Sequence, residues 1–120
     1  MNDEDLKLRT KKFAHRCVKL ALALPNNYLA NHIKGQLIRA STSVAVNYRA
    51  ACIAQTKASF IAKLSIVIEE ADESALWLEF IIDENLLVKE RVQPLFIEAK
   101  ELTAIFVKSR ITADKNRKGK

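Results

Sequence analysis

The sequence predicts an all-α, antiparallel up-and-down four-helix bundle, and three observations lead to this prediction. The 120 residues include only two Gly and two Pro, too few for the many tight turns of an all-β fold. Hydrophobic residues make up 49% of the chain, which is enough to build a core. They recur every three or four residues in four stretches that short polar breaks separate, and this spacing is typical of amphipathic helices. The length corresponds to a single domain.

The first two predicted helices cover residues 4–24 and about 31–54. The first ends at Pro25, which cannot continue a helix. The second begins at Asn31, a residue type that caps helix N-termini. Small residues dominate positions 40–51, so we expect other helix axes to approach this helix closely on more than one side. The apolar stripe of the first helix contains Leu6, Phe13, Cys17, Leu20 and Leu24.

The third and fourth predicted helices cover residues 57–83 and about 89–112. The third carries two neighbouring apolar stripes, a wider apolar arc than the surface helix of a monomer needs, and this width predicts a ring-like homo-oligomer. Residues 1–113 are therefore expected to form the bundle. Residues 114–120 contain no apolar side chain and are predicted to be a disordered basic tail.

Charge is unevenly distributed along the chain. The net charge is +6 over residues 1–50, −4 over residues 51–100 and +4 over residues 101–120. Such polarity fits an anionic partner such as nucleic acid, and equally fits head-to-tail self-association between unlike faces. The alternative for any such charge run is simple solubility. The candidate nucleic-acid contacts are the basic residues of the first helix and the tail: Lys7, Lys11, Lys12, Arg16, Lys19, Lys115, Arg117 and Lys118.

The sequence lacks the motifs that are typical of several function classes. With two glycines there is no Gly-rich phosphate loop, and Cys17 and Cys52 form neither a disulfide framework nor a Cys-x-x-Cys zinc pair. Neither His15 nor His32 follows a glutamate at the Glu-x-x-His spacing of di-metal bundles, and the sequence shows no recognisable hydrolytic triad. We therefore expect no enzyme activity, no metal and no cofactor.

The N-terminus predicts a cytoplasmic protein. It is acidic, and no apolar signal segment follows it. The longest uncharged stretch, residues 20–33, contains Pro25 and three asparagines and is no membrane span.

A run of carboxylates at residues 69–73 is the sharpest feature of the third helix. Because this helix and the second are antiparallel with a break near 55–56, facing residues should have numbers that sum to about 111. Arg39 should then lie opposite Asp72, with Glu69 and Glu73 one turn to either side. We expect an ion pair of Arg39 with these carboxylates within the bundle; the alternative is a solvated acidic face.

Four segments in this order resemble a known family: residues 37–51 (LIRASTSVAVNYRAA), 57–64 (KASFIAKL), 69–79 (EEADESALWLE) and 98–106 (EAKELTAIF). The sequence is similar over about residues 5–112 to the bacterial four-helix-bundle family of proteins encoded in 23S ribosomal RNA intervening sequences. The residues that match positions within the motifs, with a structural role implied, are Arg39, Asn47, Arg49, Glu70, Asp72 and Glu73.

The resemblance implies an up-and-down bundle, homopentameric rings and no enzyme activity. A related branch, the accessory protein of diversity-generating retroelements, is a basic pentamer that binds nucleic acid and a reverse transcriptase. We therefore expect a bacterial, non-enzymatic homo-oligomer, a pentamer by resemblance, that contacts RNA or a ribonucleoprotein. The alternative is a protein-interaction scaffold, such as an accessory subunit of a reverse transcriptase.

Overall fold

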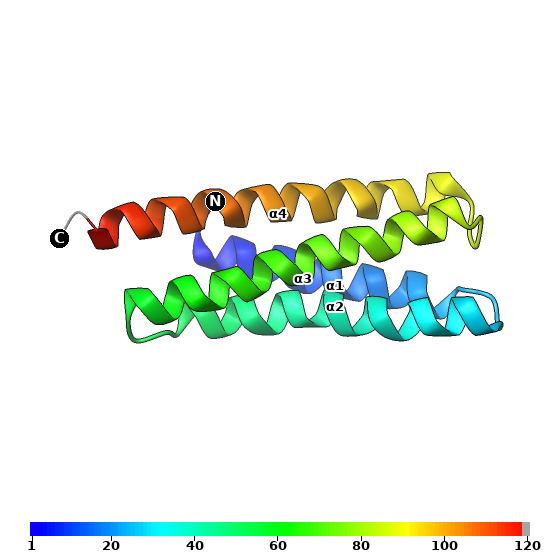
Figure 1. The fold of residues 1–120 in the computed structure, drawn as a ribbon, viewed down its shortest axis with the longest axis horizontal. Helices are drawn as coiled ribbons and strands as arrows, with labels where there is room; N and C mark the ends of the chain where they lie inside the picture. Colours follow the sequence, from blue (N-terminus) through cyan, green and yellow to red (C-terminus); the bar gives the residue numbers. More distant parts are fainter. Residues whose placement is uncertain (119–120) are drawn as a thin grey trace.

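The structure is a computed structural model that describes the backbone of residues 1–118 and the side chains of residues 1–116. Its helices are α1 (Asp3–Leu22), α2 (Tyr28–Cys52), α3 (Lys57–Asp83) and α4 (Lys89–Lys118). Consecutive helices run antiparallel and form a rod of 53 × 21 × 20 Å (Figure 1). The prediction of an all-α, up-and-down four-helix bundle is confirmed.

Asparagine and threonine side chains cap the first three helices. Asn2 caps α1, and Thr56 caps α3 by accepting a hydrogen bond from the Ser59 amide. The side chain of Asn27 accepts a 2.9 Å hydrogen bond from the Ala30 amide, so α2 begins at Tyr28. The predicted cap, Asn31, is wrong: it lies inside the first turn of α2, because the identical side chain four residues earlier already accepts the hydrogen bond that defines the cap.

Helix α4 is longer than predicted. It continues past residue 112 to Lys118, so the prediction that residues 114–118 are disordered is wrong. Ala113 is still buried against the bundle, which keeps the backbone helical at the point where the apolar stripe was expected to end. Lys115, which is exposed in the last turn, complements the negative end of the helix dipole. Residues 119–120 of the predicted tail lie outside the described part of the chain.

The core forms from one stripe of each helix. Phe13 of α1 and Phe106 of α4 are fully buried, and the ring of Tyr48 in α2 lies 5.0 Å from that of Phe106. The buried hydroxyls of Thr10 and Ser74 donate hydrogen bonds to backbone carbonyls one turn earlier, which offsets the cost of their burial. The core therefore contains large apolar side chains that come from all four helices.

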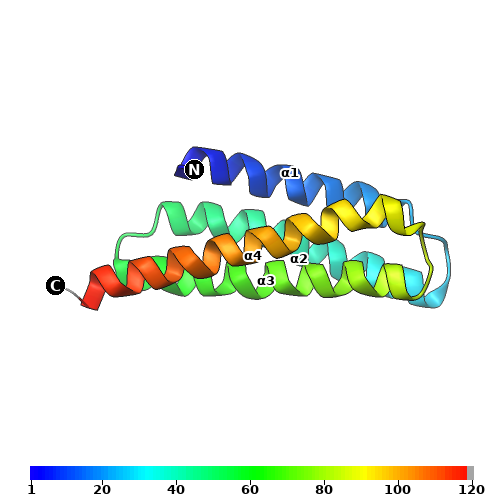
Figure 2. The ribbon, with the colours of Figure 1, turned by 90° about the horizontal axis from the view of Figure 1, so that it is seen from above.

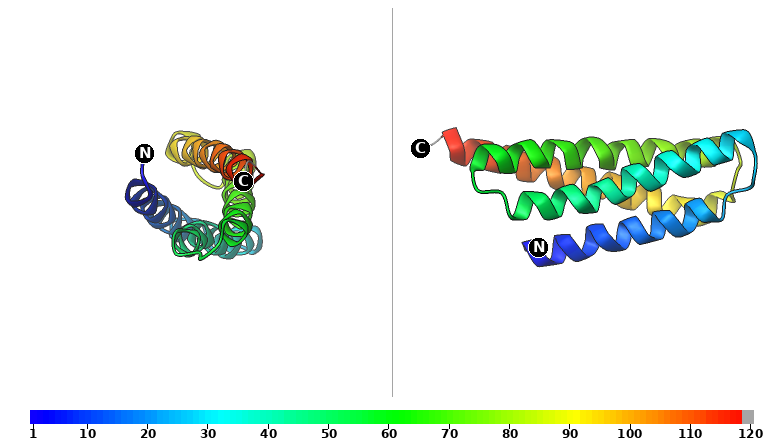
Figure 3. Two further views of the ribbon diagram at one scale, coloured as in Figure 1. Left: turned by 90° about the vertical axis from the view of Figure 1, so that its left-hand side faces the viewer. Right: turned by 90° about the horizontal axis from the view of Figure 1, so that it is seen from below.

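The neighbouring helices of the bundle do not all pack equally closely. In the end-on view the helices follow one another around the axis in the order α1, α2, α3, α4, and α1 lies diagonally opposite α3 (Figure 3). Helices α1 and α4 make fewer contacts with each other than the other neighbouring pairs do, and α1 diverges from α4 toward its N-terminus (Figure 2). Among residues 1–118 no helix combines the length and the apolar composition that crossing a membrane requires.

Candidate nucleic-acid interface

Three of the predicted basic residues form one stripe on α1. Lys12, Arg16 and Lys19 are separated by four and three residues, a spacing that places side chains on one side of a helix. All three are exposed. We call these three residues the α1 outer stripe. Because Arg9 lies one heptad before Arg16 and reaches α4, the stripe lies on the side of α1 toward α4.

The other two basic residues of α1 lie elsewhere. Lys7 and Lys11 line a shallow groove of about 490 Å³ between α1 and α2. Its apolar part includes Leu8 and Val46, which are 54% and 64% exposed. One of its cations is already paired, because Lys7 Nζ lies 3.1 Å from a carboxylate oxygen of Glu4. We call it the α1/α2 groove; its residues are Glu4, Lys7, Leu8, Lys11, Ala45, Val46 and Arg49.

The basic residues of the predicted tail belong to α4. The last turns of this helix lie at the end of the bundle where α1 begins (Figure 1), and Lys115 is exposed on them. Arg117 and Lys118 are helical in backbone, while their side chains lie outside the described part of the chain. The predicted nucleic-acid residues therefore occupy separate places: the α1 outer stripe, the α1/α2 groove and the end of α4.

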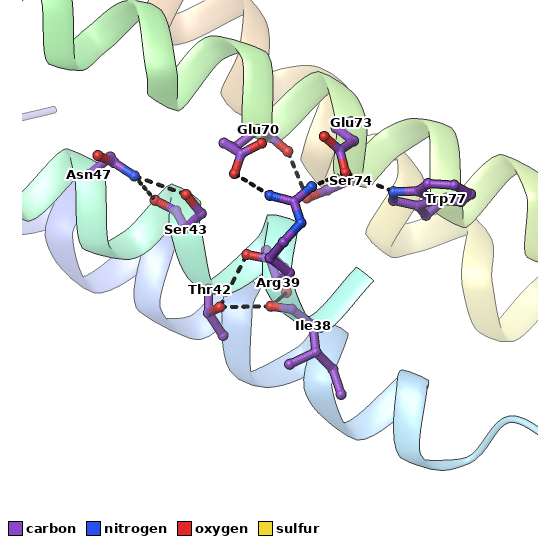
Figure 4. Close-up of polar contacts among 10 residues, drawn as sticks. Ile38, Arg39, Thr42, Ser43, Asn47, Glu70, Glu73, Ser74 and Trp77 are labelled. Atoms are coloured by element: carbon purple, nitrogen blue, oxygen red, sulfur yellow. Dashed lines mark hydrogen bonds and ion pairs between the residues drawn. The ribbon is translucent and has the colours of Figure 1, made fainter. Parts of the chain in front are cut away.

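Arg39 forms an ion-pair cluster between α2 and α3 (Figure 4). Its Nη1 donates a 2.9 Å hydrogen bond to Glu70, and its Nη2 donates to Glu73. The indole N–H of Trp77 donates a 3.0 Å hydrogen bond to the same oxygen of Glu73. The predicted partner Glu73 is thus present.

The other two predicted partners of Arg39 are wrong. Asp72 and Glu69 are exposed, and neither pairs with Arg39. Each lies one residue before the partner that the structure does use, and one residue turns a side chain by about 100° around a helix. Glu70, which the register argument left out, points toward α2 instead.

Electrostatics indicates that the Arg39 cluster is structural. Burial alone would raise the pKa of Glu73, but hydrogen bonds from Trp77 and Arg39 outweigh it and hold this pKa below its ordinary value of 4.5. The hydrogen bond to Glu73 and the neighbouring carboxylates raise the pKa of Arg39. Both groups are held in their charged forms, so neither is prepared to transfer a proton near neutral pH.

A second cluster, which the sequence analysis missed, joins α1 to α4. Arg9 donates two 2.7 Å hydrogen bonds to the carboxylate of Glu98, through Nε and Nη2, and one of 2.8 Å to Glu101. This two-pronged geometry is the strong form of an arginine–carboxylate pair. The available sequence signal was the spacing of the two glutamates, three residues apart on α4.

The cysteines and histidines form no chemical centre in the described residues. Burial raises the pKa of the Cys17 thiol to about 12, which keeps it protonated and inert. His32 is exposed, and its ring lies edge-on to that of Trp77, 5.7 Å away. Within residues 1–118 no three His, Cys, Asp or Glu side chains are grouped so that they could hold a metal ion.

The molecule is thus a small four-helix bundle. Its surface carries a basic stripe on α1, and a groove between α1 and α2 that is lined by both charged and apolar side chains. A family model for the 23S rRNA-intervening sequence protein matches residues 3–108. The chain belongs to this family, as its sequence motifs predicted.

One solved structure is similar over nearly its whole length. It is a crystal structure at 1.70 Å resolution of a protein with unknown function from the S23 ribosomal protein family of Bacteroides thetaiotaomicron VPI-5482. The two chains are 30% identical and superpose with a TM-score of 0.82, covering 92% of this chain and 98% of the other. A search of curated proteins gives no match.

Proposed function

We propose that this protein is a non-enzymatic, cytoplasmic homo-oligomer that binds RNA, alone or in a ribonucleoprotein, through the α1 outer stripe. The observation that carries the proposal is the stripe itself: Lys12, Arg16 and Lys19 are exposed on one side of α1, and none of them forms an ion pair within the described residues. Such a row of cations can neutralise successive phosphates and release their counterions.

Two further points support RNA as the anion. The family to which the chain belongs is named for 23S rRNA intervening sequences. In addition, an oligomer would present several copies of the α1 outer stripe to one polyanion, and linked weak contacts give strong overall binding. A ring such as the pentamer expected from the resemblance would arrange these copies around one axis.

The proposal of a non-enzymatic role is supported by where the shifted pKa values occur. Hydrogen bonds and ion pairs between arginine and glutamate account for the pKa shifts at Arg9 and Arg39 and, together with the hydrogen bond from Trp77, for that at Glu73. Burial is the largest cause of the pKa shifts at Cys17, Tyr48 and Cys52. These are the perturbations of a packed bundle, whereas a catalytic site gathers such groups in one cleft.

A filter-binding titration with a 23S rRNA fragment at several salt concentrations tests the proposal. For the full chain we expect the affinity to fall steeply with salt, with a log–log slope of roughly −0.7 to −0.9 per neutralised phosphate. A variant with Lys12, Arg16 and Lys19 all replaced by Gln should lose most of the affinity and flatten the slope. A matched control replaces three exposed lysines of α3 and α4 by Gln, with the same loss of charge: Lys57, Lys89 and Lys100.

Two results would contradict the proposal. Equal affinities for the stripe variant and its control would remove the α1 outer stripe from the interface. Failure of the full chain to bind RNA at about 150 mM salt would favour the alternative function, a protein-interaction scaffold such as an accessory subunit of a reverse transcriptase. The observation in favour of that alternative is apolar surface that phosphates do not need, including Leu8, Val46 and Leu76.

A further inference from the structure

The outer face of α3 combines exposed apolar side chains with exposed acids. Ile66, Leu76 and Phe80 are each at least 38% exposed. They are interspersed with carboxylates: successive positions from Ile66 to Glu79 are three or four residues apart, and Phe80 directly follows Glu79, so both kinds of side chain lie on one broad side of the helix. We call this surface the α3 outer face; it consists of Ile66, Glu69, Asp72, Leu76, Glu79 and Phe80.

The acids of the α3 outer face are available to a partner. Arg39 takes up Glu70 and Glu73, whereas Glu69 and Glu79 make no ion pair in the part of the chain that the structure describes. The apolar part of this face is held in place from below. The ring of Phe80 lies 5.6 Å from that of Trp77, and hydrogen bonding to Glu73 fixes the Trp77 indole.

The α1/α2 groove has the same composition with the opposite charge. Leu8 and Val46 provide exposed apolar surface, and the cations Lys11 and Arg49 flank them. Phosphates gain nothing from Leu8 and Val46, whereas the apolar side chains of the α3 outer face can pack against them. An acidic and apolar helix face fits this groove better than nucleic acid does.

We infer that the α3 outer face of one copy docks into the α1/α2 groove of the next copy. The inference rests on the proposed homo-oligomer and specifies its contact. Since α1 lies diagonally opposite α3, one chain cannot join its own two surfaces (Figure 3). A contact between two different surfaces repeats in one direction, and it closes into a ring when the rotation between copies allows. Such an interface requires exposed apolar patches that are flanked by charges of opposite sign.

Charge exchange tests this contact, with mass measured by light scattering on the full chain at tens of micromolar. Reversing the face, Glu69→Lys with Glu79→Lys, should reduce the mass toward the 13.6 kDa monomer. Reversing the groove, Lys11→Glu with Arg49→Glu, should do the same. All four side chains are exposed, so folding should survive, and circular dichroism checks this. A chain that carries all four reversals should associate again, because every contact then joins a basic face to an acidic groove.

A matched control reverses two other exposed cations of α1, Lys12→Glu with Lys19→Glu, and should leave the mass unchanged. Dissociation by only one of the two double reversals, or no recovery when they are combined, would overturn the inferred contact. A parent protein that is monomeric would overturn the contact and the proposed homo-oligomer together. An oligomeric parent that neither reversal affects would overturn the contact alone, and the RNA titration reports on the proposed RNA binding separately.

Discussion

The structure ranks two arginine clusters by strength, and this order can be tested by substitution. Arg9→Met and Arg39→Met each remove a guanidinium while retaining most of the aliphatic stem. The Arg9 side chain is 24% exposed and that of its main partner, Glu98, is 15% exposed, whereas the Arg39 side chain is 49% exposed. We expect Arg9→Met to be the more destabilising substitution.

The expected losses in the free energy of unfolding follow from the exposure of the side chains and the geometry of their hydrogen bonds. Without Arg9, the carboxylate of Glu98 loses both prongs of its pair while mostly shielded from water, and we expect a cost of about 2 kcal/mol, between the values for exposed and buried pairs. Without Arg39, Glu70 loses one hydrogen bond, and Glu73 keeps the one from Trp77. Glu70 is as shielded as Glu98 but loses one hydrogen bond and not two, and water screens the half-exposed Arg39 guanidinium, so we expect a smaller cost of about 1 kcal/mol.

Thermal and urea unfolding at one fixed protomer concentration measure both costs, because association shifts the apparent stability. For a chain of this size each kcal/mol corresponds to roughly 3–6 °C in Tm. A double-mutant cycle of Arg9→Met with Glu98→Gln isolates the pair energy from other effects of the substitutions. If Arg39→Met costs as much as Arg9→Met or more, the ranking by exposure and two-pronged geometry is wrong.

Three further predictions concern single side chains. Asn27→Ala should destabilise the fold by about 1 kcal/mol in urea unfolding, because it removes the cap of α2. In native protein at about pH 8, Cys52 should react with a maleimide, slowly because burial raises its pKa, while Cys17 should react only after unfolding, as mass spectrometry of timed samples would show. The pKa of Glu73 is below 4.5 in the folded state, so its pairing with Arg39 stabilises the fold above that value and is lost as the pH falls through the lower, folded-state pKa. The stability difference between the parent and Arg39→Met, measured by urea unfolding, should therefore shrink as the pH falls below 4.5.

The apolar periodicity was sufficient to predict the four helices, but their ends depended on competition between similar signals. Asn27 and Asn31 are the same residue type, and only the path of the chain after Pro25 decides which one caps α2. At the other end of the chain, Ala113 is a single small residue within a polar run. Its burial depends on which neighbours it meets, and hydrophobic patterning along one chain does not contain that information.

Ion pairs between helices were predictable only where a short loop fixes the register. The break near residue 55 located Arg39 opposite the carboxylate run to within one residue, yet that one residue separates Glu70 from Glu69 and changes the side of the helix. The pairing of Arg9 with Glu98 spans 89 positions, and no short loop joins α1 to α4. The sequence does not show which cation of α1 pairs with those glutamates, because the pairing depends on the rotation of both helices about their axes.

The rotation of α1 also decides how its cations are tested. Lys11 and Lys12 are adjacent in sequence, yet the first lines the α1/α2 groove and the second belongs to the α1 outer stripe. A variant that neutralised both would weaken the proposed self-association and the proposed phosphate binding together, and a loss of RNA affinity would then have two explanations. Substitutions confined to the stripe or to the groove separate them, because loss of phosphate contacts flattens the salt dependence, whereas dissociation of the oligomer lowers affinity by removing copies of an intact site.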